Sequence, residues 1–213
     1  MLLKRFLDYV SYETTSSEES ASSPSTSIQL KLAEHLKDEL NELKIEDVYL
    51  SDTGYVYGTL KGERDMQVIG LCSHMDTSPD ASGKDVKPRI IRDYDGKDIK
   101  LNDSLSTTVE RFPFLKDYVG KTLVVTDGTT LLGADDKAGI AIIMETLVYL
   151  INNPDIKHGD IKVCFTPDEE VGRGTENFDY DRFKVDFAYT VDGGEPNFIE
   201  YENFNAASAF IKL

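Results

Sequence analysis

Three apolar runs in this chain have the length of buried strands, and each ends in residues that bind metal ions. They are VIGLCSHMD (68–76), KVCFTPDEE (162–170) and AYTVDGG (188–194). Ligands of open α/β sheets bind in the crevice outside the carboxyl ends of the strands. We therefore expect the polar ends of these runs to meet at one edge of a sheet.

Between these runs the apolar residues recur at helical spacing, which predicts helices over residues 3–10, 25–44 and 140–151. Further short strands are predicted at DVYLS, YVYGTL and TLVVTDG, and a hairpin around RIIRDYDGKDI. Strands that alternate with helices indicate an α/β fold with a mixed, largely parallel central sheet flanked by helices.

The charge and cysteine content narrow the class of protein. The net charge of −16 disfavours nucleic acid and anionic membrane surfaces as partners. Two cysteines in apolar runs form no disulfide framework, as in a reducing cytosol. The N-terminal stretch does not resemble a signal peptide, and no stretch is long enough to span a membrane. These features predict a cytoplasmic protein.

His74 and Asp76 lie two residues apart on an extended segment, so both side chains face the same way. A neutral imidazole binds zinc well, and a carboxylate that accepts its other N–H orients the ring. Taken alone, the pair also fits a surface histidine beside an acidic turn. The other acidic clusters favour the metal site.

Two further acidic pairs leave alternatives open. Asp135 or Asp136 in GADD can cap the following helix, and the other acid is then available for a ligand. Glu169 and Glu170 point in different directions, so one can bind a metal while the other acts as a general base. A solvated acidic turn is the alternative for that pair.

One histidine and several carboxylates, including Asp192 before two glycines, suit Zn²⁺, with Co²⁺ or Mn²⁺ as substitutes. Four candidate ligands exceed the needs of one open zinc site, which indicates two metals that share a bridging carboxylate. These carboxylates would repel one another strongly without the ions.

Together these motifs resemble the peptidase T family of bacterial aminotripeptidases, within the co-catalytic zinc peptidase superfamily. The resemblance extends along the chain through RFLDYVS, SHMDTSPDASGK, TLLGADDKAGIA, HGDIKVCFTPDEEVGRG, AYTVDGG and YENFNAASA. It implies a cytosolic aminopeptidase that releases the N-terminal residue of tripeptides by attack of a metal-bridging water. It also implies two zinc ions per active site and a homodimer for the full-length form.

The resemblance also assigns roles to single residues. It makes His74 and Asp192 ligands of the first metal, Glu170 a ligand of the second and Asp135 the bridging ligand, with a cis peptide bond after it. Two further residues act in catalysis: Asp76 orients the histidine, and Glu169 is the general base.

Members of that family are considerably longer. We therefore expect residues 1–205 to be the N-terminal part of the catalytic domain and 206–213 the start of an absent lid and dimerisation domain. The second histidine of the second metal site would be missing, since His35 and His158 lie in no ligand motif. One tight zinc site and weak or no activity follow. The alternatives are a related dipeptidase or deacylase, and a metal-binding fragment without turnover.

Overall fold

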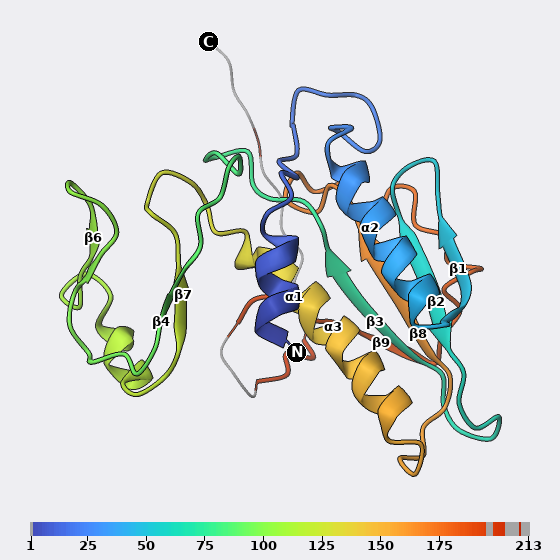
Figure 1. Cartoon of the computed structure of the whole chain (residues 1–213). Helices are drawn as coiled ribbons and strands as arrows, with labels where there is room; N and C mark the ends of the chain where they lie inside the picture. The colour runs from blue at the N-terminus through green and yellow to red at the C-terminus, as the bar shows by residue number, and fades with distance from the viewer. Residues whose placement is uncertain (1, 195–197, 203–208, 210–213) are drawn as a thin grey trace.

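A five-stranded mixed sheet forms the centre of the molecule in the computed structural model, which describes residues 2–194, 198–202 and 209. Its strands run in the order β1-β2-β8-β3-β9 (Figure 1). β2 pairs antiparallel with both β1 and β8, whereas β8, β3 and β9 are mutually parallel. The bounds are Glu46–Leu50 (β1), Val56–Leu60 (β2), Ile69–His74 (β3), Ile161–Thr166 (β8) and Phe187–Thr190 (β9).

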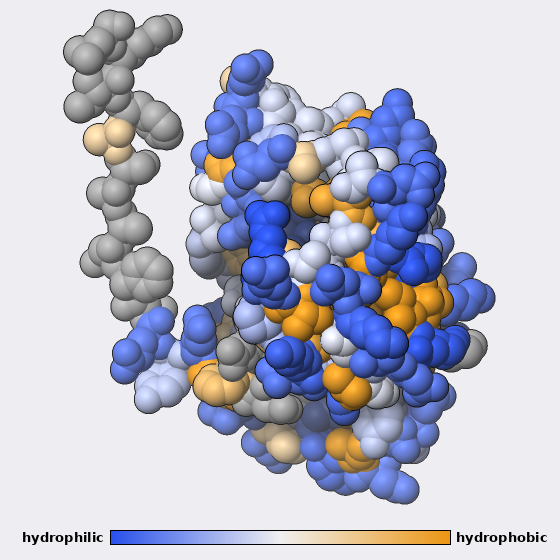
Figure 2. Space-filling view, turned by 90° about the vertical axis from the view of Figure 1, so that its left-hand side faces the viewer, coloured by the Kyte–Doolittle hydropathy of each residue, from blue (hydrophilic) through white to orange (hydrophobic). Residues whose placement is uncertain are grey.

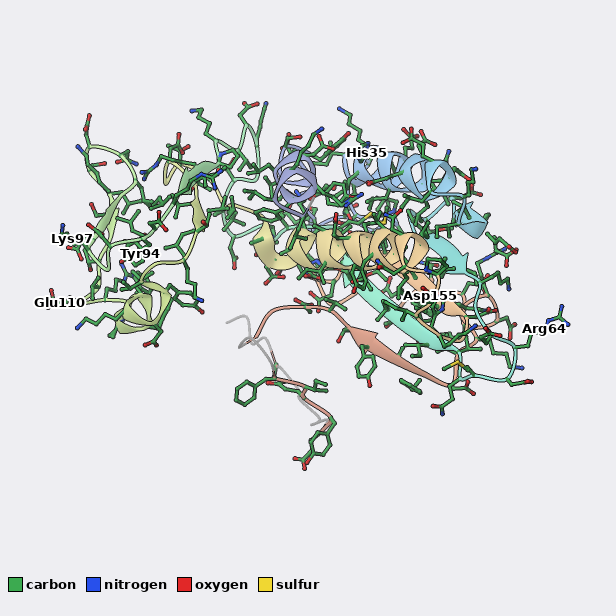
Figure 3. The ribbon with its side chains drawn as sticks, turned by 60° about the horizontal axis from the view of Figure 1, so that its bottom comes forward. His35, Arg64, Tyr94, Lys97, Glu110 and Asp155 are labelled. Atoms are coloured by element: carbon green, nitrogen blue, oxygen red, sulfur yellow. The ribbon has the colours of Figure 1, made fainter. Side chains whose placement is uncertain are left out.

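Three α-helices cover one face of this sheet (Figures 1 and 3). α2 packs on β1 and β2, α3 packs on β3, and α1 packs on α3. Their bounds are Leu2–Tyr9 (α1), Gln29–Glu42 (α2) and Ala134–Asn152 (α3). Within the described ranges, no helix combines the length and apolar character that a membrane crossing requires.

The opposite face of the sheet is covered in part by the segment after β8. Alternate residues of a strand face opposite sides of the sheet. Gly58 of β2 accordingly faces Leu40 and Ile45 on the helical side, while Tyr57 packs with Phe178 and Phe183 on the other. The aromatic rings on this second face form a small core of their own beneath the 167–186 segment.

A lobe that includes four short strands extends to one side of the sheet (Figure 1). β4 (Arg89–Ile91) pairs with β7 (Leu123–Val125), β5 (Ile99–Lys100) pairs with β6 (Ser106–Thr107), and a 3-10 helix spans Pro113–Tyr118. The surface seen from this side is largely hydrophilic, with separate hydrophobic patches (Figure 2). Tyr94, Ile99 and Leu115 form the buried core of the lobe.

The structure confirms the predicted fold class and corrects two local predictions. The hairpin predicted at residues 89–99 is wrong, because β4 pairs with β7, which lies far along the chain. The second helix begins at Gln29 rather than residue 25, because Ser25 is engaged with the distant Asp168. The predicted boundary at 205/206 and all of 206–213 except Ala209 lie outside the described residues.

Candidate metal centre

His74 ends β3 with its imidazole almost fully buried and one ring edge turned toward a group of carboxylates. Its Nδ1 lies 3.0 Å from the backbone carbonyl oxygen of Asp76 and 3.3 Å from the carboxylate of the same residue. Asp76 is fully buried and holds the ring on its Nδ1 side. Nε2 is thereby left to face outward from the end of the strand.

Three carboxylates surround this Nε2. It lies 2.9 Å from Oδ1 of Asp135, 3.7 Å from Oε2 of Glu169 and 3.8 Å from Oδ2 of Asp192. Ligand atoms of His74, Asp135 and Asp192 all lie within 4.8 Å of one another. Three segments distant in sequence therefore meet at the carboxyl end of the parallel strands, as the sequence predicts.

Asp135 and Asp136 divide the two roles that the sequence leaves open. Asp136 is buried, and its carboxylate accepts the N–H of Gly139 at 3.1 Å, as an N-cap residue does, together with the hydroxyl of Ser73. Asp135 keeps an exposed carboxylate that contacts only the imidazole among the ion pairs of the described residues. The peptide bond between the two residues is cis, in agreement with the resemblance.

The turn after β8 carries Glu169 and Glu170 to the same edge. Their backbone N–H groups donate to the two carboxylate oxygens of Asp76, at 2.9 and 3.1 Å. Asp76 therefore links the histidine to this turn. Both glutamates have raised pKa values, which burial and then the neighbouring carboxylates cause, with His74 opposing the shift.

The imidazole is strongly affected by this environment. Burial alone favours its neutral form, but the hydrogen bond to Asp76 and the carboxylates of Asp136 and Asp192 raise the pKa of His74 to about 10. In the metal-free protein the ring is therefore cationic at neutral pH. Its charge offsets part of the repulsion among the acids.

The donor set fits a metal ion. An imidazole whose far nitrogen is held by a carboxylate, with two further carboxylates in reach, is a typical zinc environment. Within the described part of the chain, no lysine or arginine forms an ion pair with Asp135, Glu169 or Asp192. An ion bound to His74, Asp135 and Asp192 would neutralise carboxylates that otherwise pair only with one histidine.

A second ion finds fewer donors in the described residues. The carboxylate of Asp135 is close enough to Glu170 that, after burial, its negative charge raises the pKa of Glu170. His35 interacts with Asp8 at 3.1 Å on the helical side, where Figure 3 labels it. His158 precedes the start of β8, whereas the site lies beyond its end, a strand length of about 20 Å away. Neither histidine reaches the site.

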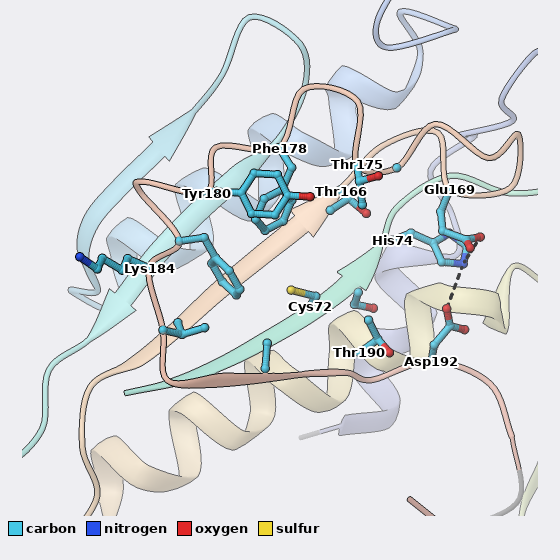
Figure 4. A pocket seen from close by; sticks show the side chains of 15 residues that line it. Cys72, His74, Thr166, Glu169, Thr175, Phe178, Tyr180, Lys184, Thr190 and Asp192 are labelled. Carbon is cyan, nitrogen blue, oxygen red and sulfur yellow. Dashed lines mark ion pairs between the residues drawn. The ribbon is translucent and has the colours of Figure 1, made fainter. Parts of the chain in front are cut away.

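An apolar cavity of about 610 Å³ opens beside the centre (Figure 4). His74, Glu169 and Asp192 lie at one end of it, and the ring of Phe178 lies further along. The cavity lies on the face of the sheet opposite the helices. A ligand that reaches the candidate metal centre through this cavity would therefore pass along a largely apolar surface.

Two contributors to the centre do not emerge from the sequence reasoning. Ser73 donates to Asp136, and Asp168 lies 1 % exposed beneath the acidic turn, bonded to Ser25 and Gln29. For Ser73, the alternation of side chains along β3 is the only feature of the sequence that indicates an inward-facing position. Asp168 has no local signal, since its partners lie 139 and 143 residues away.

Comparison with known proteins gives consistent matches in sequence. Residues 123–207 match the model of the peptidase family M20/M25/M40. The whole chain is 56 % identical to peptidase T of Caldanaerobacter subterraneus subsp. tengcongensis, covering 53 % of that protein. Peptidase T of Clostridium perfringens is 54 % identical over 99 % of this chain and 52 % of its own length. The chain thus spans about half the length of the curated relatives it matches.

Solved structures share the fold. Aminopeptidase PepT from Bacillus cereus superposes with a TM-score of 0.64 at 26 % identity, over 91 % of this chain and 43 % of that one. A tripeptidase from Staphylococcus aureus gives 0.63 at 25 % identity with the same coverage. From these matches, the chain is similar to peptidase T over its whole length, and its residues 123–207 are similar to the peptidase family M20/M25/M40.

Proposed function

We propose that this chain supplies most of the metal-binding and acid–base residues of a metal-dependent aminopeptidase that releases the N-terminal residue of tripeptides. The observation that carries the proposal is the convergence of His74 Nε2 with the carboxylates of Asp135 and Asp192, with Glu169 beside them. The similarity to a tripeptidase from Staphylococcus aureus supports the substrate class.

Each residue has a role that its position supports. His74, Asp135 and Asp192 would hold the first metal, and Asp135 and Glu170 would contribute to a second. Zinc bound there would supply Lewis-acid chemistry, polarising the peptide carbonyl and making water a better nucleophile.

Glu169 has the position and the raised pKa of a general base. Among the described residues no lysine or arginine pairs with Glu169, and with the neutral imidazole bound to a metal its carboxylate could take a proton from water and return it to the leaving amine. Asp76 holds the imidazole in one orientation and bonds the backbone of the glutamate turn. Asp76 thereby sets the distance between the metal ligands and the base.

A second candidate function is metal binding without turnover. It is favoured by the donor count, because among the described residues only Asp135 and Glu170 are available to a second ion. Two carboxylates alone hold zinc weakly. For a form as long as the relatives we propose a homodimer, and a donor outside the described residues would complete the second site.

Peptide hydrolysis assays separate these functions. The purified chain with zinc, and a chimera in which residues 1–213 replace the matching half of the Clostridium perfringens relative, are assayed on di-, tri- and tetrapeptides and on N-acyl amino acids. We expect tripeptide cleavage by the chimera and little or none by the chain alone. Preference for dipeptides or N-acyl substrates would favour the related dipeptidase or deacylase. An inactive chimera that binds zinc would leave the metal-binding function.

A further inference from the structure

Asp168 is a buried carboxylate that takes no direct part in the metal centre. Three donors from the segment before α2 and its first turn satisfy it: Ser25 N–H at 2.7 Å, Ser25 Oγ at 2.5 Å and Gln29 Nε2 at 2.7 Å. Burying a carboxylate is costly unless hydrogen bonds to the charged group compensate. Hydrogen bonds from a segment that is distant in sequence therefore compensate for the burial of this one carboxylate.

The backbone at Asp168 determines where the next two residues go. Its φ of 59° lies in the left-handed region, which aspartate tolerates better than most residues. The turn that follows is closed by Arg173 N–H donating to the Asp168 carbonyl at 2.8 Å. In this conformation the N–H groups of Glu169 and Glu170 both point at Asp76.

Other contacts join the same two segments. Arg173 donates to the carbonyl oxygens of Ser20 and Ser22, and the amide of Asn177 donates to Ser23 at 3.1 Å. These contacts lie at more exposed positions than the Asp168 bonds. The Ser-rich loop, residues 16–27, thus lies along the turn after β8 and is joined to it at several points.

We propose that Asp168 is a positioning residue: held by Ser25 and Gln29, it fixes the turn that presents Glu169 and Glu170 to the metal centre. The roles of those two glutamates rest on the proposed function, whereas the positioning itself does not. The Ser-rich loop is then part of the support of the site, through its hydrogen bonds to Asp168, Arg173 and Asn177.

Hydrogen exchange at the two glutamate amides tests the positioning directly in the 213-residue chain. In Asp168→Asn the Ser25 and Gln29 donors lose their charged acceptor, and one of the two accepting oxygens becomes an NH2 group. The hydrogen bonds that hold this side chain are therefore weakened with little change of volume. We expect the amides of Glu169 and Glu170 to exchange roughly tenfold faster or more, while amides within β8 change less. Ser25→Ala is the milder variant should Asp168→Asn not fold, and it should shift the same two amides in the same direction.

Asp160→Asn is the matched control. Asp160 also accepts a backbone N–H from a distant segment, that of Gly62 at 3.0 Å, but it precedes the other end of β8. The control should leave exchange at the glutamate amides unchanged. Equal exchange there in Asp168→Asn, Ser25→Ala and the unmodified chain would overturn the proposal, as would an increase spread evenly over the chain.

Kinetics of the chimera supply a second readout. There Asp168→Asn should lower kcat about 10–100-fold and leave KM within about threefold, because small misplacements of catalytic groups are that costly. If the glutamate amides exchange faster in this variant of the chimera but kcat is unchanged, the hydrogen bonds to Asp168 do not contribute to catalysis. That result would overturn this part of the proposal. If the chimera without the Asp168 substitution is inactive, the proposed function is contradicted. The positioning role of Asp168 is still tested, because hydrogen exchange is measured in the 213-residue chain.

Discussion

Asp135 and Asp136 are consecutive in the chain, yet their carboxylates serve different parts of the molecule. The Asp135 side chain is 67 % exposed with Oδ1 at 2.9 Å from His74 Nε2. Asp136 is 2 % exposed and accepts the N–H groups of His74 and Gly139. One acid is available to a ligand, and the other organises the end of β3 and the beginning of α3.

This division predicts opposite effects of two neighbouring substitutions. Asp135→Asn should weaken zinc binding by more than the roughly 10–100-fold that loss of an outer partner of a ligand costs, with little change in stability. Asp136→Asn should lower the free energy of unfolding by about 1–3 kcal/mol, because one of the two oxygens that accept the buried N–H groups of His74 and Gly139 becomes an NH2 group. Calorimetric zinc titration and urea denaturation of the metal-free chain measure the two effects. Interchanged results would mean that Asp136 is the ligand.

Glu169 should be needed for turnover but not for metal content. In the full-length chimera, Glu169→Ala should reduce turnover by about 10²–10⁴-fold or more, since that is the usual contribution of a general acid–base group. Metal analysis after gel filtration should show nearly unchanged zinc. Loss of both metals in this variant would show that Glu169 and Glu170 have the reverse roles.

The two metal positions should differ in affinity in the 213-residue chain. The first has three protein ligands in His74, Asp135 and Asp192, a workable number for zinc with water completing the shell. In the part of the chain that the structure describes, the second has only Asp135 and Glu170. Zinc titration of metal-free chain should therefore show one tight site and a weak or empty second one. Two equally tight sites with full tripeptidase activity would contradict this expectation.

Zinc binding should release a proton from His74. The metal needs the neutral imidazole, but in the metal-free chain Asp76 and the nearby carboxylates outweigh burial and raise the pKa of His74 to about 10. Below that pH the proton competes with zinc, so the apparent affinity should rise about tenfold per pH unit from roughly pH 6 to 9.

Calorimetry at pH 7 in two buffers of different ionisation enthalpy counts the protons released. We expect about one per tight site, and fewer in Asp76→Asn, which lacks the carboxylate that most raises this pKa. No proton release in the unmodified chain would mean that the imidazole is already neutral.

The sheet and the meeting of His74 with Asp192 are predictable because they depend on local patterns. Apolar runs identify the buried strands, and parallel neighbours place their carboxyl ends together. A polar residue just after such a run therefore lies at that edge whatever the details of the loops. Assigning Asp135 rather than Asp136 to the metal needed the family resemblance, since both are acids in the first turn of one helix.

The remaining features depend on contacts between residues distant in the chain. The partners of Asp168 lie before and within α2, and β4 pairs with β7 across an intervening pair of strands. Short strands of three residues carry too little periodicity to indicate their partner. The partner of Ser25 is also distant in the chain. Its sequence context therefore predicts the start of a helix, although its hydroxyl donates to the carboxylate of Asp168.

β9 lies at the border of the sheet, and in the described part of the chain β3 is its sole hydrogen-bonded neighbour. Asp192 follows this border strand, while His74 ends the neighbouring one. A cation held by both residues would fasten the outermost strand to the interior of the sheet, as a cross-link does. Metal binding would then slow local unfolding of β9, so the catalytic ion would also stabilise the edge of the sheet.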